Sequence, residues 1–242
     1  MPVTLKRRLS SGDFEPPDRP APLTVLEPVA RETLGDQIYG QLREALMAGQ
    51  FRPGQAITLR SVAEALGVSH MPVRAALQRL EAAGAMVAPA NGRTLVIPEM
   101  RLAEMCELRD IRVELEGLAA ERAAALITNT ELLVVEEHCH LMQAAAATGN
   151  LDNYIRENWA FHTAVYRASK MKQLLAIVEG LWLRIGPYIC LMMPDRAALA
   201  ASMPNHHRVL EALRARDGAA ARAGIAADIN DSAQALERIL PQ

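Results

Sequence analysis

The chain has 242 residues, half of them hydrophobic but only 4% aromatic, and a formal net charge of −2. This length allows a sizeable core in one or two domains, and the Ala- and Leu-rich composition predicts mostly helix. The near-neutral charge argues against a protein that coats nucleic acid over its whole surface. No run of about 18 apolar residues and no signal-peptide centre occur, so we expect a cytoplasmic protein with no membrane partner.

Composition divides the chain into three predicted parts. Residues 1–28 hold six of the fourteen prolines and show little periodicity, which predicts a flexible or extended tail. Residues 29–98 carry seven basic and five acidic residues, whereas residues 99–242 carry fifteen basic and nineteen acidic ones. This difference favours a DNA-binding domain over 29–98 joined to a different kind of domain over 99–242.

An amphipathic helix is predicted at the start of the second part. Apolar residues recur every three or four positions from near Thr33, and the pattern ends at Gly49. The segment FRPGQAI that follows is predicted as a turn. A short second helix is predicted from about Leu59 to Leu66, with Gly67 as its C-terminal cap.

A third helix is predicted over 67–84, and its first turn differs from the rest. Its last three turns carry an apolar stripe, whereas Ser69 is a preferred N-cap and Pro72 stands where a missing N–H costs little. The unpaired N–H groups of this end favour a phosphate, and Arg74 can reach a guanine edge or a phosphate. A capped amphipathic helix with a surface arginine is the alternative interpretation.

The pattern after Gly84 changes from helical to extended. The β-prone segments AMVAPA and RTLVIP flank Asn91-Gly92, which is the strongest short-range signal of a hairpin. The order of helix, helix, turn, helix and hairpin is that of a winged helix-turn-helix, whose second motif helix enters the major groove of DNA.

The remaining residues predict only helices. Breaks in the periodicity separate segments at roughly 101–127, 130–148, 151–169, 171–192, 195–216 and 218–240. Pro187 is expected to kink or split the fourth of them. The predicted fold class is therefore mainly α: an N-terminal winged helix-turn-helix with a small β-hairpin wing, then an all-α antiparallel bundle of six to seven helices.

One segment of the bundle suggests metal chemistry. Asn158 and His162 are four residues apart, so they share a helix face on which both can reach one ion. Further ligands are available from His206, His207 and Asp228, but the two adjacent histidines point about 100° apart, so only one can join. A polar cluster in the core without metal is the alternative.

The segment QLREALMAGQFRPGQAITLRSVAEALGVSHMPVRAALQRLEAAGAMV resembles the winged-helix domain of the GntR transcription-factor family. The resemblance rests on G-x-x-x-P-G and on a pattern close to L-A-x-x-L-G-V-S-R-x-P-V-R. It implies double-stranded DNA as partner, and His70 stands where the family usually has Arg. The implied DNA contacts are Arg60, Ser69, His70, Met71, Arg74, Asn91, Gly92 and Arg93.

The segments LRDIRVELEGLAAERAA, NWAFHTAVYRAS and HHRVLEALRARDGAAARAGIAADI make residues 99–242 similar to the FCD effector-binding domain of the FadR subfamily. That domain binds a divalent metal through D-x-x-x-H and two later histidines. The resemblance places the ligands at Asn158, His162, His207 and Asp228, where Asn replaces Asp and Asp replaces the last His. Zinc, manganese and nickel are all compatible with this set.

The same resemblance implies an effector site in the bundle. Arg112 matches a position that often faces the effector, where its guanidinium beside a metal ion would suit a small carboxylate. An ion pair of Arg112 with Glu116, one turn on, is the alternative. Weaker candidates for effector contacts are Arg109, Arg184, Tyr188 and Asn230.

Together the two resemblances imply a ligand-responsive, sequence-specific transcriptional regulator, expected to be a repressor and not an enzyme. We expect a homodimer on a palindromic operator with half-sites roughly 34 Å apart. A small organic acid that binds two dimer geometries unequally would shift its occupancy of DNA. A metal-dependent enzyme that carries a DNA-binding domain, and a sequence-indifferent architectural protein, are the alternatives.

Overall fold

The computed structural model describes residues 33–89, 94–193 and 195–241, and it confirms the predicted fold class. Thr33 starts the first helix with a capping box, since its hydroxyl accepts from the Asp36 N–H and the Asp36 carboxylate accepts from the Thr33 N–H. Gly67 ends the second helix with a φ of 64°, a left-handed conformation that glycine adopts readily. The helices before the bundle are α1 (Leu34–Met47), α2 (Leu59–Leu66) and α3 (His70–Ala82).

A small antiparallel sheet joins a strand that precedes α2 to a strand that follows α3. Strand β1 (Ala56–Ile57) pairs with β2 (Leu95–Val96), and a further bridge joins Val87 to Val96. The two extended segments on either side of Asn91-Gly92 therefore do pair, but the turn itself lies outside the described residues. The prediction of FRPGQAI as turn alone was incomplete, because the buried Ile57 at its end pairs in the sheet.

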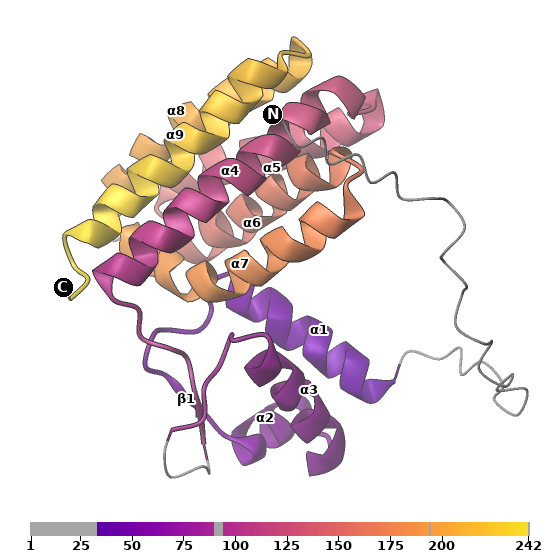
Figure 1. Ribbon diagram of the computed structural model, residues 1–242, viewed down its shortest axis with the longest axis vertical. Helices are drawn as coiled ribbons and strands as arrows, with labels where there is room; N and C mark the ends of the chain where they lie inside the picture. The colour runs from indigo at the N-terminus through magenta and orange to yellow at the C-terminus, as the bar shows by residue number, and fades with distance from the viewer. Residues whose placement is uncertain (1–32, 90–93, 194, 242) are drawn as a thin grey trace, which may run out of the picture. The chain divides into compact units, whose positions relative to one another are not determined.

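Six described helices form the bundle, close to the predicted boundaries. Figure 1 shows α4 running alongside α9, while α5 packs on α6 and α8. The packing is that of an antiparallel bundle with an apolar interior. The bounds are α4 (Leu102–Leu126), α5 (Asn129–Thr148), α6 (Leu151–Ala168), α7 (Lys172–Met192), α8 (Arg196–Arg214) and α9 (Gly218–Glu237).

Helix α7 continues through Pro187 and is not split. Proline removes one helical hydrogen bond, but residues 185–189 are all buried, so their packing helps to hold the helix together. This helix is long and apolar enough to cross a membrane by length and composition, with a mean hydropathy of 1.6. Half of that stretch is buried against the rest of the protein, as in the core helix of a bundle.

Helix α7 also contacts α1, and residues from Thr33 onward form one compact unit. Arg43 donates to Glu179 at 2.8 Å, and the last turn of α1 packs directly on Gly186. Next to it, the Tyr188 hydroxyl accepts from the backbone N–H of Met100 at 2.5 Å and donates to the Pro98 carbonyl at 3.1 Å. The two bonds of Tyr188 hold residues 97–101, the linker between β2 and the bundle, against α7.

A Gly186→Ala substitution is expected to lower the free energy of unfolding by about 1–3 kcal/mol. The added Cβ would overlap the Leu46 carbonyl oxygen and lie 2.8 Å from Met47 Cα, both backbone atoms that cannot rotate away. Gly180→Ala, on the same helix with no atom within 4 Å, is the matched control and should stabilise by about 0.5–1 kcal/mol. Urea unfolding measures both, and equal effects would contradict the contact of α1 with α7.

Candidate functional site

The start of α3 presents an exposed polar surface. Ser69 has the extended N-cap conformation and is followed by the exposed His70 and Met71, the latter 73% exposed. Ser69 is the N-cap residue of α3, as predicted, but its hydroxyl makes no capping hydrogen bond. At this exposed helix start, the Ser69 hydroxyl and the first N–H groups of α3 lie at the positive end of a helix dipole.

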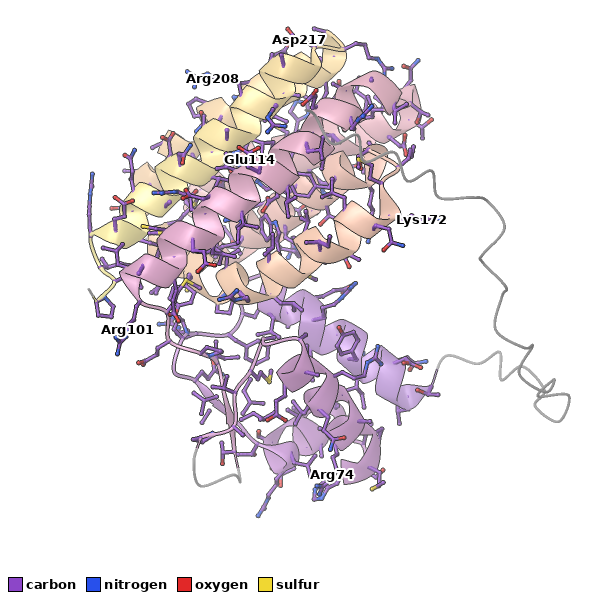
Figure 2. All side chains as sticks on the ribbon, in the orientation of Figure 1. Arg74, Arg101, Glu114, Lys172, Arg208 and Asp217 are labelled. Atoms are coloured by element: carbon purple, nitrogen blue, oxygen red, sulfur yellow. The ribbon has the colours of Figure 1, made fainter. Side chains whose placement is uncertain are left out.

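Two arginines of α3 have different surroundings. Arg79 donates to Asp36 at 2.7 Å and lies 3.8 Å over the ring of Tyr39, so it fastens α3 to α1. Arg74 is exposed at the other end of α3 (Figure 2), and no ion pair joins it to a described residue. Arg74 is thus available to an external partner, whereas Arg79 is structural.

The remaining predicted DNA contacts fall in two places. Arg60, in the first turn of α2, is exposed and pairs with Glu64 at 2.7 Å, an interaction that contributes little at the surface. Asn91, Gly92 and Arg93 lie outside the described residues.

Inside the bundle, four polar side chains from three helices converge. His162 and Asn158 lie on α6, His206 on α8 and Asp228 on α9, and each is at most 8% exposed. His206 Nε2 lies 3.3 Å from His162 Nε2 and 2.9 Å from Asn158 Oδ1. An Asp228 oxygen lies 3.4 Å from His162 Nε2, so one atom of each histidine and of Asp228 falls within a sphere suited to a metal ion.

Hydrogen bonds outside the cluster assign the proton on each neutral imidazole. His206 Nδ1 lies 3.1 Å from the Ser202 carbonyl, which can only accept, so the proton is on Nδ1 and Nε2 is bare. Tyr166 donates its hydroxyl proton to Glu116, so its oxygen accepts from His162 Nδ1 at 3.0 Å, and Nε2 is bare here too. Two bare nitrogens, an amide oxygen and a carboxylate then face one another, which is the donor set of a cation site.

The electrostatics of the cluster favour the same protonation states. Burial lowers the pKa of His206 below its usual 6.5, although Asp228 opposes this, and the imidazole stays neutral. Burial would raise the pKa of Asp228, but the neighbouring His206 and His162 lower it to about 2. Neutral imidazoles and an ionised carboxylate are the forms that bind metals.

The structure places His206 in the cluster, and not His207, the ligand predicted from the sequence. The two residues point in different directions from α8, and His207 is half-buried on the outer face, beside a shallow apolar groove between α8 and α9. A signal in the sequence distinguishes them, because His206 falls on the buried stripe of α8 and His207 does not. That stripe consists of Leu199, Met203, His206, Leu210 and Leu213.

Arg112 is engaged inside the protein. Its Nε donates to Glu116 at 2.6 Å, and its guanidinium lies 5.1 Å from the ring of Trp182. Burial would lower the pKa of Arg112, but the Glu116 carboxylate raises it overall. The cavity next to Arg112 measures only about 10 Å³, room for no more than about one water molecule. The alternative interpretation, an Arg112–Glu116 ion pair, is the arrangement found.

The weaker effector candidates do not surround the cluster. Arg109 pairs with Asp110 and with Glu237, near the ends of α4 and α9. Arg184 is exposed and lines a separate cavity of about 430 Å³ beside the linker. The Tyr188 hydroxyl is bonded to the Met100 N–H and the Pro98 carbonyl, and Asn230 is exposed on α9 because its position lies off the buried stripe.

A larger cavity reaches the cluster from another side. It measures about 290 Å³, lies between the end of α7 and helices α8 and α9, and has Asp228 in its wall. Its polar lining was not anticipated from the sequence, since hydroxyl and amide side chains spaced along two helices form no recognisable motif. The polar residues are Ser202, Asn205, Asp228, Asp231, Ser232, Gln234 and Arg238.

Comparisons with known proteins agree with this architecture. Residues 34–96 match the model of bacterial regulatory proteins of the gntR family, and residues 107–231 match the FCD domain. The HTH-type transcriptional regulator McbR of Escherichia coli K12 is 34% identical over 75% of this chain and 82% of its own length. A solved structure of E. coli McbR/YncC has a TM-score of 0.76 and 32% identity, covering 83% of this chain and 95% of that one. The E. coli K12 transcriptional repressor RspR is 22% identical over 86% of this chain and 91% of its own length.

The buried neutral His206 predicts a pH dependence of stability in the presence of a chelator. Below pH 6.5 the unfolded chain takes up a proton at this residue and the folded chain does not. Its contribution is therefore complete above pH 6.5 and is lost as the pH falls toward the folded pKa, by at most about 1.4 kcal/mol per pH unit.

Urea unfolding between pH 7.5 and 5.5 checks this prediction. The fall in unfolding free energy should be smaller in His206→Gln than in the wild type. His207→Gln, which changes the neighbouring residue outside the cluster, should keep the wild-type slope. A slope that changes with His207 and not with His206 would reverse the assignment.

Proposed function

This chain belongs to the GntR family of bacterial regulatory proteins and carries an FCD domain, and on that premise we propose a metal-dependent, effector-responsive repressor. It is a transcriptional regulator, and the families and relatives that match it are regulators and not enzymes. The cluster of inward-facing acceptors in the bundle is the observation that carries the proposal. A cytoplasmic location follows from action on DNA.

The outward surface of α3 supports sequence-specific reading of an operator by a homodimer. Arg74 can bind a guanine edge with both arms of its guanidinium, while the Ser69 hydroxyl and the helix start bind a phosphate. His70 and Met71 add a shorter polar contact and an apolar one. Repression as the mode of action is supported by the relative RspR, which is named a repressor.

The residues of the cluster fit a divalent metal. His162 and His206 each direct a bare nitrogen to the same point, and Asp228 and Asn158 supply oxygens. The set of nitrogens and oxygens is compatible with zinc, manganese or nickel. When bound, the ion would attract an anionic ligand group and neutralise the buried Asp228.

The cavity of about 290 Å³ supports entry of a small organic acid from the α8 and α9 side. Its wall includes Asp228, so a ligand there lies next to the cluster. Since Arg112 is already paired with Glu116 and has almost no open space, we assign the effector carboxylate to the metal and not to Arg112. A ligand that binds two dimer geometries unequally would change operator occupancy.

The metal site is tested by elemental mass spectrometry of protein purified without an affinity tag and reloaded with zinc, manganese or nickel. Wild type should retain about one ion per chain, and His162→Ala and His206→Ala should each retain much less because each loses a nitrogen ligand. His207→Ala should match the wild type. Metal content that is the same in all four proteins would exclude the site.

The DNA surface is tested on an operator selected from random sequences with the wild-type protein. Arg74→Ala should weaken binding to that operator about tenfold to a hundredfold and change binding to unrelated DNA much less, since a base contact is lost. Arg167→Ala removes the same charge from the exposed face of α6 and should leave the operator affinity unchanged. Equal losses in the two variants would indicate a general charge effect in place of base reading.

A further inference from the structure

A second buried polar group is centred on the carboxylate of Glu116 and is joined through Tyr166 to the cluster of Asn158, His162, His206 and Asp228. This carboxylate is completely buried in α4. It accepts from Arg112 Nε at 2.6 Å, from the Tyr166 hydroxyl at 2.5 Å and from Trp182 Nε1 at 3.1 Å. The donors come from α4, α6 and α7, so one charged group connects three helices, and Arg112 balances its charge.

The direction of the hydrogen bonds leads from this carboxylate to the cluster. An ionised carboxylate only accepts, so the Tyr166 hydroxyl must donate to it. The oxygen of Tyr166 is left with lone pairs only, and it lies 3.0 Å from His162 Nδ1.

We propose that Tyr166, anchored by Glu116, is the positioning residue that holds His162 in the Nδ1–H tautomer with its bare Nε2 directed at the metal. The inference rests on the metal site proposed above and assigns its outer support. His206 obtains the same orientation from a backbone carbonyl, which no substitution removes, so Tyr166 is the replaceable support. Partners of this kind commonly raise the metal affinity of a histidine ligand.

The chain contains a matched control for this role. Tyr154 is also on α6, is also fully buried, and its hydroxyl also makes a hydrogen bond, to the Ser202 side chain. A Tyr→Phe change therefore removes one buried hydroxyl bond at either position. Only at Tyr166 does the lost oxygen face a proposed ligand, so a difference between the variants reports positioning and not stability.

The first experiment reads the tautomer directly, in protein kept free of metal with a chelator. Long-range proton–nitrogen NMR of histidine-labelled protein distinguishes a protonated ring nitrogen from a bare one, with His162→Gln to assign the signals. Wild type and Tyr154→Phe should show His162 protonated at Nδ1. Tyr166→Phe should lose this state and populate the Nε2–H tautomer. Should Tyr166→Phe fail to fold, the wild type alone decides, since an Nε2–H tautomer there overturns the proposal.

The second experiment measures zinc affinity by competition with a chromophoric chelator. Tyr166→Phe should bind zinc about 10- to 100-fold more weakly than wild type, and Tyr154→Phe should stay close to wild type. Wild type that binds zinc together with an unchanged affinity in Tyr166→Phe would overturn the positioning role. Wild type that binds no zinc would overturn the metal site, and the tautomer of His162 would still decide the role of Tyr166.

Discussion

With both rings protonated at Nδ1, the bare Nε2 atoms of His162 and His206 face each other 3.3 Å apart, and this pair sets the central constraint of the bundle. In a buried, low-dielectric place, such a pair of lone pairs is repulsive unless a positive charge lies among them. Asp228 and Asn158 add further oxygens to the same point. Helices α6, α8 and α9 therefore meet at a buried cluster whose nitrogen and oxygen atoms would suit a cation.

The surrounding residues are arranged to preserve this state. Each imidazole has its other nitrogen bound by an acceptor, so neither ring can turn its proton inward without losing a hydrogen bond. The one buried carboxylate behind the site, Glu116, is balanced by Arg112 and does not add net charge to the core. The polar interior thus has two parts. The Glu116–Arg112 pair has no net charge, and the cluster in front of it carries the negative charge of Asp228, which also lines a cavity of about 290 Å³.

The sequence predicted the helices well because their ends carry local signals, such as Thr33 with Asp36 at one start and Gly67 at one end. Predictions from the sequence were incomplete where tertiary packing decides the local structure or the partner of a side chain. Strand β1 exists because residues some forty positions later pair with it. Which of His206 and His207 faces the cluster depends on the rotation of α8 about its axis. Which group Arg112 contacts depends on how tightly the core around it is filled. Such features belong to the assembled bundle and have no short-range pattern.

The chain has only two tryptophans, and the fold places both at the same spot. Trp159 and Trp182 lie 4.8 Å apart between ring centroids, and Trp182 is 5.3 Å from the ring of His162 while its N–H donates to Glu116. Indole emission depends on nearby charge and hydrogen bonding. The intrinsic fluorescence of this protein therefore originates beside the buried cluster, so the molecule carries its own optical reporter of what occupies that cluster.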